Sequence, residues 1–126
     1  MRETKVWGNV WHIFQTANSA VSHLQLSEGF QCSRHMHAQR DNLFAVVAGM
    51  ILVEVWRGET IQAVKLRVGE SFVVPAGLYH RFKVLKSGEV IEIYSPAYPG
   101  AIVSFDDIYR TDVGGAFSVD IDKAGK

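Results

Sequence analysis

A succession of short strand-like segments, separated by turn residues at intervals of roughly ten residues, is the feature that most constrains this fold. Residues 20–26 and 60–68 alternate between polar and apolar side chains, whereas residues 43–48 are apolar throughout. Glycine-containing turns are expected at residues 27–29 and 57–59. No stretch has the apolar periodicity of a long amphipathic helix. The sequence therefore predicts an all-β domain, built as a sandwich or a barrel.

The remaining expected elements follow from the same preferences, because β-branched and aromatic side chains favour extended backbone. Further strands are predicted over residues 5–16, 30–37, 50–56, 71–74, 79–85 and 89–95, with a break at Gly49, a polar connection over residues 38–41 and a turn over residues 86–88.

Two histidines, His35 and His37, are separated by one residue within the strand expected over residues 30–37. Side chains at positions i and i+2 of a strand project from the same face, so the two imidazoles would point the same way. Two neighbouring imidazole nitrogens can hold one metal ion. The alternative is a solvated polar strand end that binds nothing.

A third histidine is presented by the sequence GESFVVPAGLYH, which covers residues 69–80. Pro75 ends an apolar strand, and Gly77 permits a tight turn before the next strand. His80 therefore stands at the start of a new strand, where it is a candidate partner for the first two imidazoles.

Together the two stretches resemble the two signature motifs of the cupin superfamily. The matching positions are Gly29, His35, His37, Asn42 and Gly49 in the first motif, and Gly69, Pro75, Gly77 and His80 in the second. The chain departs from the family pattern at Asn42, where Glu is usual, and at Val84, where Asn is frequent. The resemblance implies an all-β double-stranded β-helix, the cupin jelly roll, in one domain over residues 1–126. Its core would cover about 20–96 and a C-terminal extension 97–126. A divalent metal would be held by His35, His37, Asn42 and His80.

Shorter matches resemble the cupin domain of the type II mannose-6-phosphate isomerases. They are Val6-Trp7-Gly8, Cys32-Ser33, Arg40, Glu92-Ile93-Tyr94-Ser95 and Asp106-Asp107-Ile108-Tyr109-Arg110. That family has Gln at the position of His35. The closer resemblance implies an isomerase-like activity on a phosphorylated or nucleotide-linked sugar, with Arg110 as a ligand for the substrate phosphate. In the alternative, Arg110 pairs with Asp106 or Asp107 and anchors the C-terminal segment.

Three imidazoles and one amide form a neutral ligand set. Compared with a set that contains Glu, it leaves more positive charge on the ion but binds the ion less tightly. Asn42 would ligate through its carbonyl oxygen or hold a water molecule. These ligand types accept zinc, nickel, iron, manganese or cobalt.

An isomerase also needs a general base, and the candidates are Glu92 and Tyr94, which share one strand face. They could line a cavity or face solvent. Because Ile91 and Ile93 supply an apolar face to the same strand, we expect Glu92 and Tyr94 to face solvent.

Other polar residues near the motifs are assigned structural roles. Arg34 and Arg40 flank the first two histidines and are expected to be solvated surface charges. His12 and His23 have no partner at ligand spacing. Regular alternation places Cys32 on the strand face opposite the ligands, which indicates a small core residue.

Three functions are compatible with these residues. The first is a metal-binding cupin related to the sugar-phosphate isomerases. The second is a non-catalytic module that binds a metal or a small ligand. The third is an iron(II) dioxygenase, because three histidines can leave coordination positions open for substrate and O2. A catalytic carboxylate in the cavity would favour the first function.

The amino-acid composition restricts the classes of binding partner that this chain is expected to have. The 126 residues, 48% of them hydrophobic, suit one domain, and 13 basic against 13 acidic residues give zero net charge. This balance predicts no nucleic-acid partner, and no apolar run approaches the ~20 residues of a membrane span. The single cysteine and the absence of a signal-peptide pattern predict a cytoplasmic protein. The family resemblance implies a small-molecule ligand such as a phosphorylated sugar. We expect a homodimer, with Val6, Trp7, Val10 and Trp11 as candidate interface residues.

Overall fold

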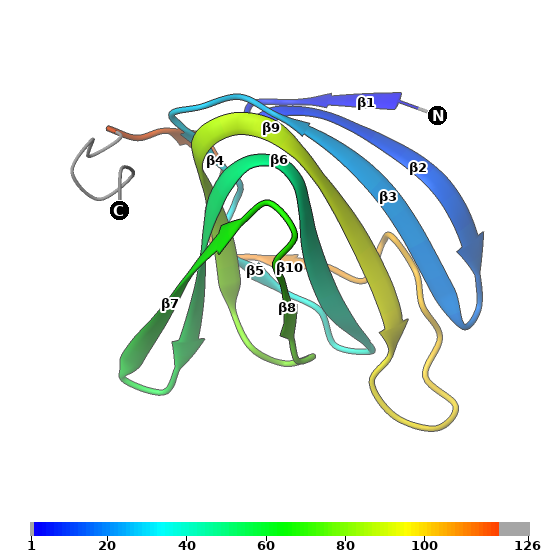
Figure 1. Ribbon diagram of the computed structural model, residues 1–126. Coiled ribbons are helices and arrows are strands. Elements are labelled where there is room, and N and C mark those ends of the chain that lie inside the picture. The colour runs from blue at the N-terminus through cyan, green and yellow to red at the C-terminus, as the bar shows by residue number, and fades with distance from the viewer. Residues whose placement is uncertain (1, 119–126) are drawn as a thin grey trace.

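The computed structural model describes residues 2–118, in which all regular secondary structure is β-strand, as predicted (Figure 1). None of these residues forms a helix that could cross a membrane. The strands are β1 (Arg2–Lys5), β2 (Gly8–Thr16), β3 (Ser19–Leu26), β4 (Phe30–Gln31), β5 (His35–Met36), β6 (Arg40–Arg57), β7 (Thr60–Arg67), β8 (Ser71–Val74), β9 (His80–Pro96), β10 (Tyr109–Arg110) and β11 (Gly115–Ala116).

The long strands β6 and β9 build the frame of the domain, because each belongs to both halves of the fold. They pair antiparallel along most of their length: Asn42 lies opposite Tyr94 near one end, and Val55 lies opposite His80 near the other. β3, β2 and β1 extend the sheet from β9, while β7 and β8 pair with β6. Figure 1 shows that β6 and β9 arch together, so that the strands curl into a half-barrel. This is the jelly-roll architecture expected from the sequence.

The arch lies where two glycines bring β6 and β9 into close backbone contact. Gly49 has φ +81°, a left-handed conformation that glycine adopts without steric cost. A Cβ atom on Gly88 would lie 1.9 Å from the carbonyl oxygen of Ala48, and the register between the strands shifts on both sides of Ala48. The predicted break at Gly49 and turn over residues 86–88 are therefore wrong, because both strands continue through an irregular, bent pairing.

Gly88→Ala is expected to destabilise the domain, because the added methyl group would collide with backbone atoms of the facing strand. We expect the free energy of unfolding to fall by about 1–3 kcal/mol or more. Gly115→Ala is the matched control, since nothing lies within 4 Å of the added group there. Urea unfolding measures both variants, and equal stabilities would contradict a close contact at the arch.

The hydrophobic core lies inside the curled sheet. Trp7 packs edge-on against Phe82, with ring centroids 5.1 Å apart, and the ring of Phe44 also packs against Phe82, with centroids 6.0 Å apart. Val10 belongs to the same buried cluster. The expectation that Trp7 and Val10 form a subunit interface is therefore wrong, because the core of their own chain covers both side chains.

Two predicted strands are shorter in the structure, because the chain turns within them. The strand expected over residues 30–37 is divided into β4 and β5, and that over residues 5–16 is interrupted by a turn at residues 6–7. After β9 the chain returns to the first of these segments, where β10 pairs with β5 and β11 pairs with β4. Residues 119–126 of the expected C-terminal extension lie outside the described residues.

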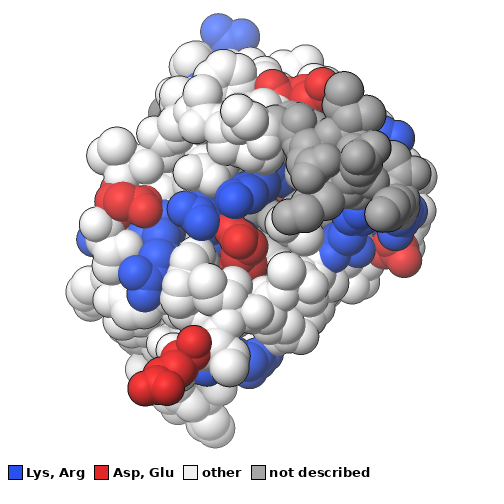
Figure 2. Space-filling model, turned by 90° about the vertical axis from the view of Figure 1, so that its left-hand side faces the viewer, with Lys and Arg blue, Asp and Glu red and all other residues white. Residues whose placement is uncertain are grey.

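Charged side chains of both signs are interspersed on the face shown in Figure 2. Elsewhere in the structure, charges of both signs also pair directly: the Glu54 carboxylate lies 2.9 Å from the guanidinium of Arg81 and 3.6 Å from the ammonium of Lys83. The mixture of signs on this face agrees with the zero net charge of the chain.

Candidate metal centre

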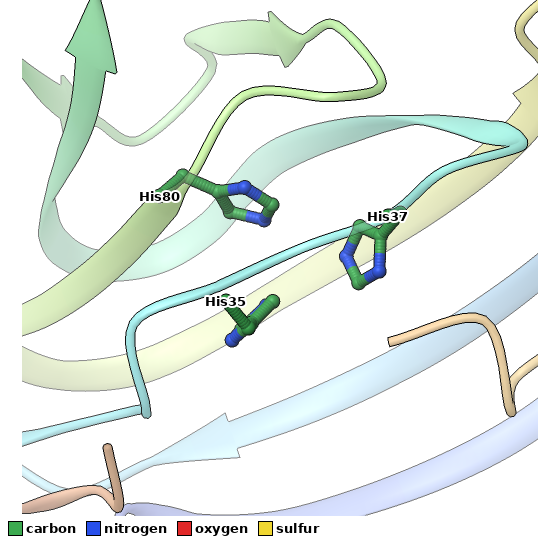
Figure 3. Close-up of side chains that lie close together, drawn as sticks. All are labelled: His35, His37 and His80. Atoms are coloured by element: carbon green, nitrogen blue, oxygen red, sulfur yellow. The ribbon is translucent and has the colours of Figure 1, made fainter. Parts of the chain in front are cut away.

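The structure brings together the three histidines of the two motifs (Figure 3). His35 lies in β5, His37 follows directly after β5, and His80 begins β9 opposite His35 in the antiparallel register. One ring nitrogen from each histidine lies within 4.8 Å of the other two. A single ion placed between the rings could contact all three.

Each imidazole is oriented by a hydrogen bond from its Nδ1 atom to a backbone carbonyl. The acceptors are Ser33 for His35 at 2.8 Å, Asp107 for His37 at 2.7 Å and Leu78 for His80 at 3.0 Å. A carbonyl oxygen only accepts, so Nδ1 carries the proton and Nε2 keeps its lone pair. The Nε2 atoms of His37 and His80 are buried and have no partner among the described residues. Nitrogen donors that are fixed and free in this way fit a metal ion.

Burial keeps the three imidazoles neutral. Desolvation is the main reason that the pKa falls to about 3 for His35, to about 2 for His37 and to about 4 for His80. The charge of Arg40 lowers the pKa of His37 further. Neutral imidazole is the form that binds metals. At neutral pH the three histidines therefore need to lose no proton before they can bind a metal ion.

Asn42 points to the interior from β6 and is fully buried. Its Nδ2 atom donates to Oε2 of Glu92 at 3.0 Å, while its Oδ1 atom has no partner among residues 2–118. An ionised carboxylate only accepts hydrogen bonds, so the contact with Glu92 fixes the amide orientation. Phe44, on the same face of β6, lies beside the His80 ring with centroids 6.3 Å apart. The carbonyl oxygen of Asn42 is thus a buried oxygen donor without a partner among the described residues.

Glu92 and Tyr94 line the cavity, and the prediction that they face solvent is wrong. Both are buried in phase with Val90 on the inner face of β9, whereas Ile93 is 39% exposed on the outer face. Burial raises the pKa of the Glu92 carboxyl, and hydrogen bonds from Asn42 and Tyr94 oppose that rise. The sequence misplaced these residues because the outer face of this strand is also apolar.

Arg40 is also interior, although the sequence suggested a solvated charge. β6 begins at Arg40, so its side chain shares the inner face with Asn42, and only 2% of the residue is exposed. Its Nη1 atom donates to the carbonyl oxygen of Ser104, and its guanidinium lies 4.0 Å from the ring centroid of Tyr94. Arg34 is not a freely solvated charge either, because its guanidinium lies against two aromatic rings.

Several of these side chains line one cavity of about 550 Å³. Its wall includes His35, His37, Arg40, Glu92 and Tyr94. A cavity of this size is typical of small-molecule sites. Convergent imidazoles, a carboxyl group and a guanidinium on one wall can bind a metal, move a proton and hold an anion.

A protein-family model for the cupin domain matches residues 22–94, more than half of the chain. This chain is a cupin. Among curated proteins, none matches its sequence. Similar solved structures include oxalate decarboxylase from Bacillus subtilis, with 14% identity and a TM-score of 0.75 over 88% of this cupin. KdgF from Halomonas sp. has 23% identity and a TM-score of 0.65 over 75%, and CapF has 19% and 0.71 over 90%. The match covers 84% of the KdgF chain but only 30% of oxalate decarboxylase and 34% of CapF. At these identities the likeness establishes the fold alone.

In this cupin, Asp107 anchors the C-terminal segment. From the sequence alone, this role is one of two alternatives for Arg110. The Asp107 carboxylate accepts hydrogen bonds from the backbone N–H groups of Ala38 at 2.9 Å and Gln39 at 2.8 Å, and its carbonyl orients His37. Arg110 is exposed at the cavity edge and forms no ion pair with any carboxylate of residues 2–118. Asp107 therefore supports the histidine cluster from outside it.

Asp107→Ala is expected to weaken metal binding by about 10- to 100-fold, because the backbone that carries the His37 acceptor loses two of its attachments. Asp106→Ala is the matched control, since it removes an exposed carboxylate one residue away. Titration calorimetry with manganese on metal-free protein measures both affinities. Equal affinities in the two variants would contradict a supporting role for Asp107.

The residues assigned structural roles lie outside the histidine cluster. The Nδ1 atom of His12 lies 2.9 Å from the hydroxyl of Ser22, and the Nε2 atom of His23 lies 3.2 Å from the carboxylate of Glu89. Cys32 is buried in the core, and burial raises the pKa of its thiol to about 12. A thiol with so high a pKa is a poor nucleophile and a poor ligand at neutral pH.

Proposed function

We propose that this cupin holds one divalent metal ion with His35, His37 and His80, completed by Asn42, and catalyses an isomerase-like proton transfer on a small sugar-like molecule. The metal would be zinc, nickel, iron, manganese or cobalt. Manganese has a precedent in this fold, because one similar structure concerns the Mn(II) centres of oxalate decarboxylase. When bound, the ion would polarise a carbonyl group of the substrate.

The observation that carries this proposal is the carboxyl group of Glu92 in the wall of the same cavity as the imidazoles of His35 and His37. An aldose–ketose isomerisation removes a proton from the carbon beside a carbonyl group and returns one to the neighbouring carbon, so it needs a base that can also act as an acid. Glu92 is held in place by Asn42 and Tyr94 and has a raised pKa, which suits a group that takes and returns a proton. A module that only binds a metal has no need of this arrangement.

Arg110 supports the choice of a phosphorylated substrate. Its guanidinium is exposed at the edge of the cavity and has no carboxylate partner among the described residues. In β10 it lies opposite His35 of β5. A phosphate at this edge would be bound by Arg110 while the sugar reached inward to the histidines.

Exchange of a substrate proton with solvent tests the proposed activity. Metal-loaded protein in deuterated water is expected to incorporate deuterium at C2 of mannose 6-phosphate or of another phosphorylated or nucleotide-linked sugar, as followed by NMR. Glu92→Gln is expected to slow this exchange by about 100-fold or more while metal content stays unchanged. Glu89→Gln, on the same strand but paired with His23, is the control. Full exchange in Glu92→Gln, or no metal in the wild type, would refute the proposal.

We also propose a homodimer that covers an apolar row on the outer face of the sheet. The row consists of Phe14, Val21, Ile93, Leu43 and Val73, which lie side by side on β2, β3, β9, β6 and β8. Phe14 is 51% exposed and Val73 is 46% exposed. Such a row is typical of a contact between subunits.

Light scattering at micromolar concentration is expected to give the mass of a dimer, and Ile93→Lys is expected to give a monomer. The physical reason is that a charge buried at the centre of an apolar interface costs far more than it does in water. Lys65→Glu, a charge change in β7 away from the row, is the control. A monomeric wild type would contradict this proposal.

A further inference from the structure

Arg40 is a buried cation that the proposed proton transfer does not use. It begins β6, shares the inner face of that strand with Asn42, and lies in the cavity wall with His37 and Glu92. Arginine is almost never fully buried unless it is paired. The groups around Arg40 therefore indicate which chemical class of ligand the cavity binds.

The positive charge of Arg40 has no negative partner in the described part of the chain. Nη1 donates to the carbonyl oxygen of Ser104, and the guanidinium lies over the ring of Tyr94, so its contacts are a neutral dipole and a π face. No carboxylate of residues 2–118 lies within ion-pair distance of it. The Arg40 charge lowers the pKa of the Glu92 carboxyl, but the two groups form no ion pair. A buried charge without a counter-ion in contact is costly, which favours an anion from outside.

One edge of the guanidinium is free to bind that anion. Nε is buried and has no acceptor among the described residues, and no acceptor is found there for Nη2. The Nε and Nη2 hydrogens point in parallel and match the two oxygens of a carboxylate. The edge is thus an unused two-donor site.

Glu92 does not fill this edge, although it is the carboxyl group that shares the cavity wall with Arg40. One of its oxygens accepts the Nδ2 hydrogen of Asn42 at 3.0 Å, and Tyr94 contributes a second hydrogen bond. These two donors fix its place, and neither a hydrogen bond nor an ion pair joins it to Arg40 within residues 2–118.

We infer that Arg40 binds a carboxylate group of the ligand through its Nε–Nη2 edge, so that the cavity takes a small hydroxy or keto acid of the sugar-acid type. This inference rests on the proposed function in one respect: the proposed function directs the other oxygens of the ligand toward the histidines. It deepens that function, because it names a second recognised group besides the phosphate assigned to Arg110.

A carboxylate fits this position better than a phosphate does. One guanidinium edge offers two parallel donors and one positive charge, which match a planar monoanion. A phosphate dianion there would place two negative charges in the same wall as Glu92, and like charges in a buried site repel strongly. Arg110 at the open edge is the better position for a dianion, because water screens it there.

Calorimetric titration of metal-free protein with three related probes tests the inference. D-glycerate carries a carboxylate, glycerol 3-phosphate carries a phosphate, and glycerol carries neither. Wild-type protein is expected to bind D-glycerate about 10-fold or more tightly than glycerol, and more tightly than glycerol 3-phosphate. Arg40→Lys, which keeps the charge but loses the two-donor edge, is expected to lose about 10-fold in D-glycerate affinity. Arg57→Gln, at the exposed far end of β6, is the control and should not change it.

The outcomes separate this inference from the proposed function. Equal binding of D-glycerate and glycerol to the wild type overturns the carboxylate site, and so does tighter binding of glycerol 3-phosphate that depends on Arg40. The comparison of D-glycerate with glycerol needs only wild-type protein. The test therefore remains decisive even if the Arg40→Lys variant does not fold. Metal content measured on the same samples decides the metal centre independently, because the titrations contain no metal.

Discussion

The metal content of a His37→Ala variant is expected to fall from about one divalent ion per chain to near zero. Three imidazoles supply every nitrogen donor of the cluster, and the Nε2 atom of His37 is buried with no other partner in the described chain. Removal of one ligand leaves a two-histidine site, which holds a divalent ion far more weakly. Elemental analysis of protein purified without chelators measures the effect.

His23→Ala is the matched control for this variant. His23 is also on a strand, but it pairs with Glu89 and stacks on Trp11 outside the cluster. Its removal should leave metal content unchanged. Full metal occupancy in His37→Ala, or equal losses in both variants, would show that the ion lies elsewhere.

Acid is expected to unfold the metal-free protein steeply. In the native state the pKa values of the three histidines lie at about 4, 3 and 2, below the value of 6.5 that applies when the chain is unfolded. Between these limits the unfolded chain binds up to three more protons than the native chain, so the free energy of unfolding decreases as the pH falls from about 6.5. Each histidine contributes about 1.4 kcal/mol per pH unit, and the three together about 4.

This slope removes about 6 kcal/mol by pH 5, an amount comparable to the whole stability of a typical domain. Glu92 acts in the opposite direction, because its raised pKa stabilises the protonated native state at low pH, but it is one group against three. Urea unfolding in EDTA at several pH values measures the slope. His80→Gln is expected to reduce it by about a third, and a flat profile in the wild type would mean that the imidazoles are charged in the native state.

The histidine cluster was predictable because its geometry is local. The spacing of His35 and His37, and the turn with Pro75 and Gly77 before His80, are set by strand alternation and turn chemistry within short windows. The pairing of β5 with the start of β9 then brings the two windows together. The jelly-roll fold followed from the same two motifs.

The inner wall of the cavity was less predictable, because the phase of a strand with two apolar faces is ambiguous. Ile91 and Ile93 suggested an inner face that in fact lies outside, so Glu92 and Tyr94 were assigned to solvent. Arg40 was assigned to a polar connection, whereas β6 already begins there. Counting back two residues from Asn42 along the strand would have placed Arg40 on the inner face.

The support of the site by Asp107 could not be derived from local pattern. The residue lies in a segment without long strands, and its contacts with His37, Ala38 and Gln39 join positions about 70 residues apart. A single sequence carries no signal for such a contact beyond the short Asp-Asp-Ile match. Long-range hydrogen bonds of this kind depend on the whole fold rather than on propensity.

Because β6 and β9 each run through both halves of the sheet, the proposed metal-binding donor set can assemble only when nearly the whole chain is present. His37 is oriented by a carbonyl 70 residues further along the chain, and Asn42 meets Glu92 across 50 residues. Contacts over such separations require large loops to close, and all-β domains of this kind fold over milliseconds to seconds. A nascent or refolding chain would therefore expose individual histidines long before it could form the complete donor set. Metal uptake during refolding should lag behind strand formation and mark the final step.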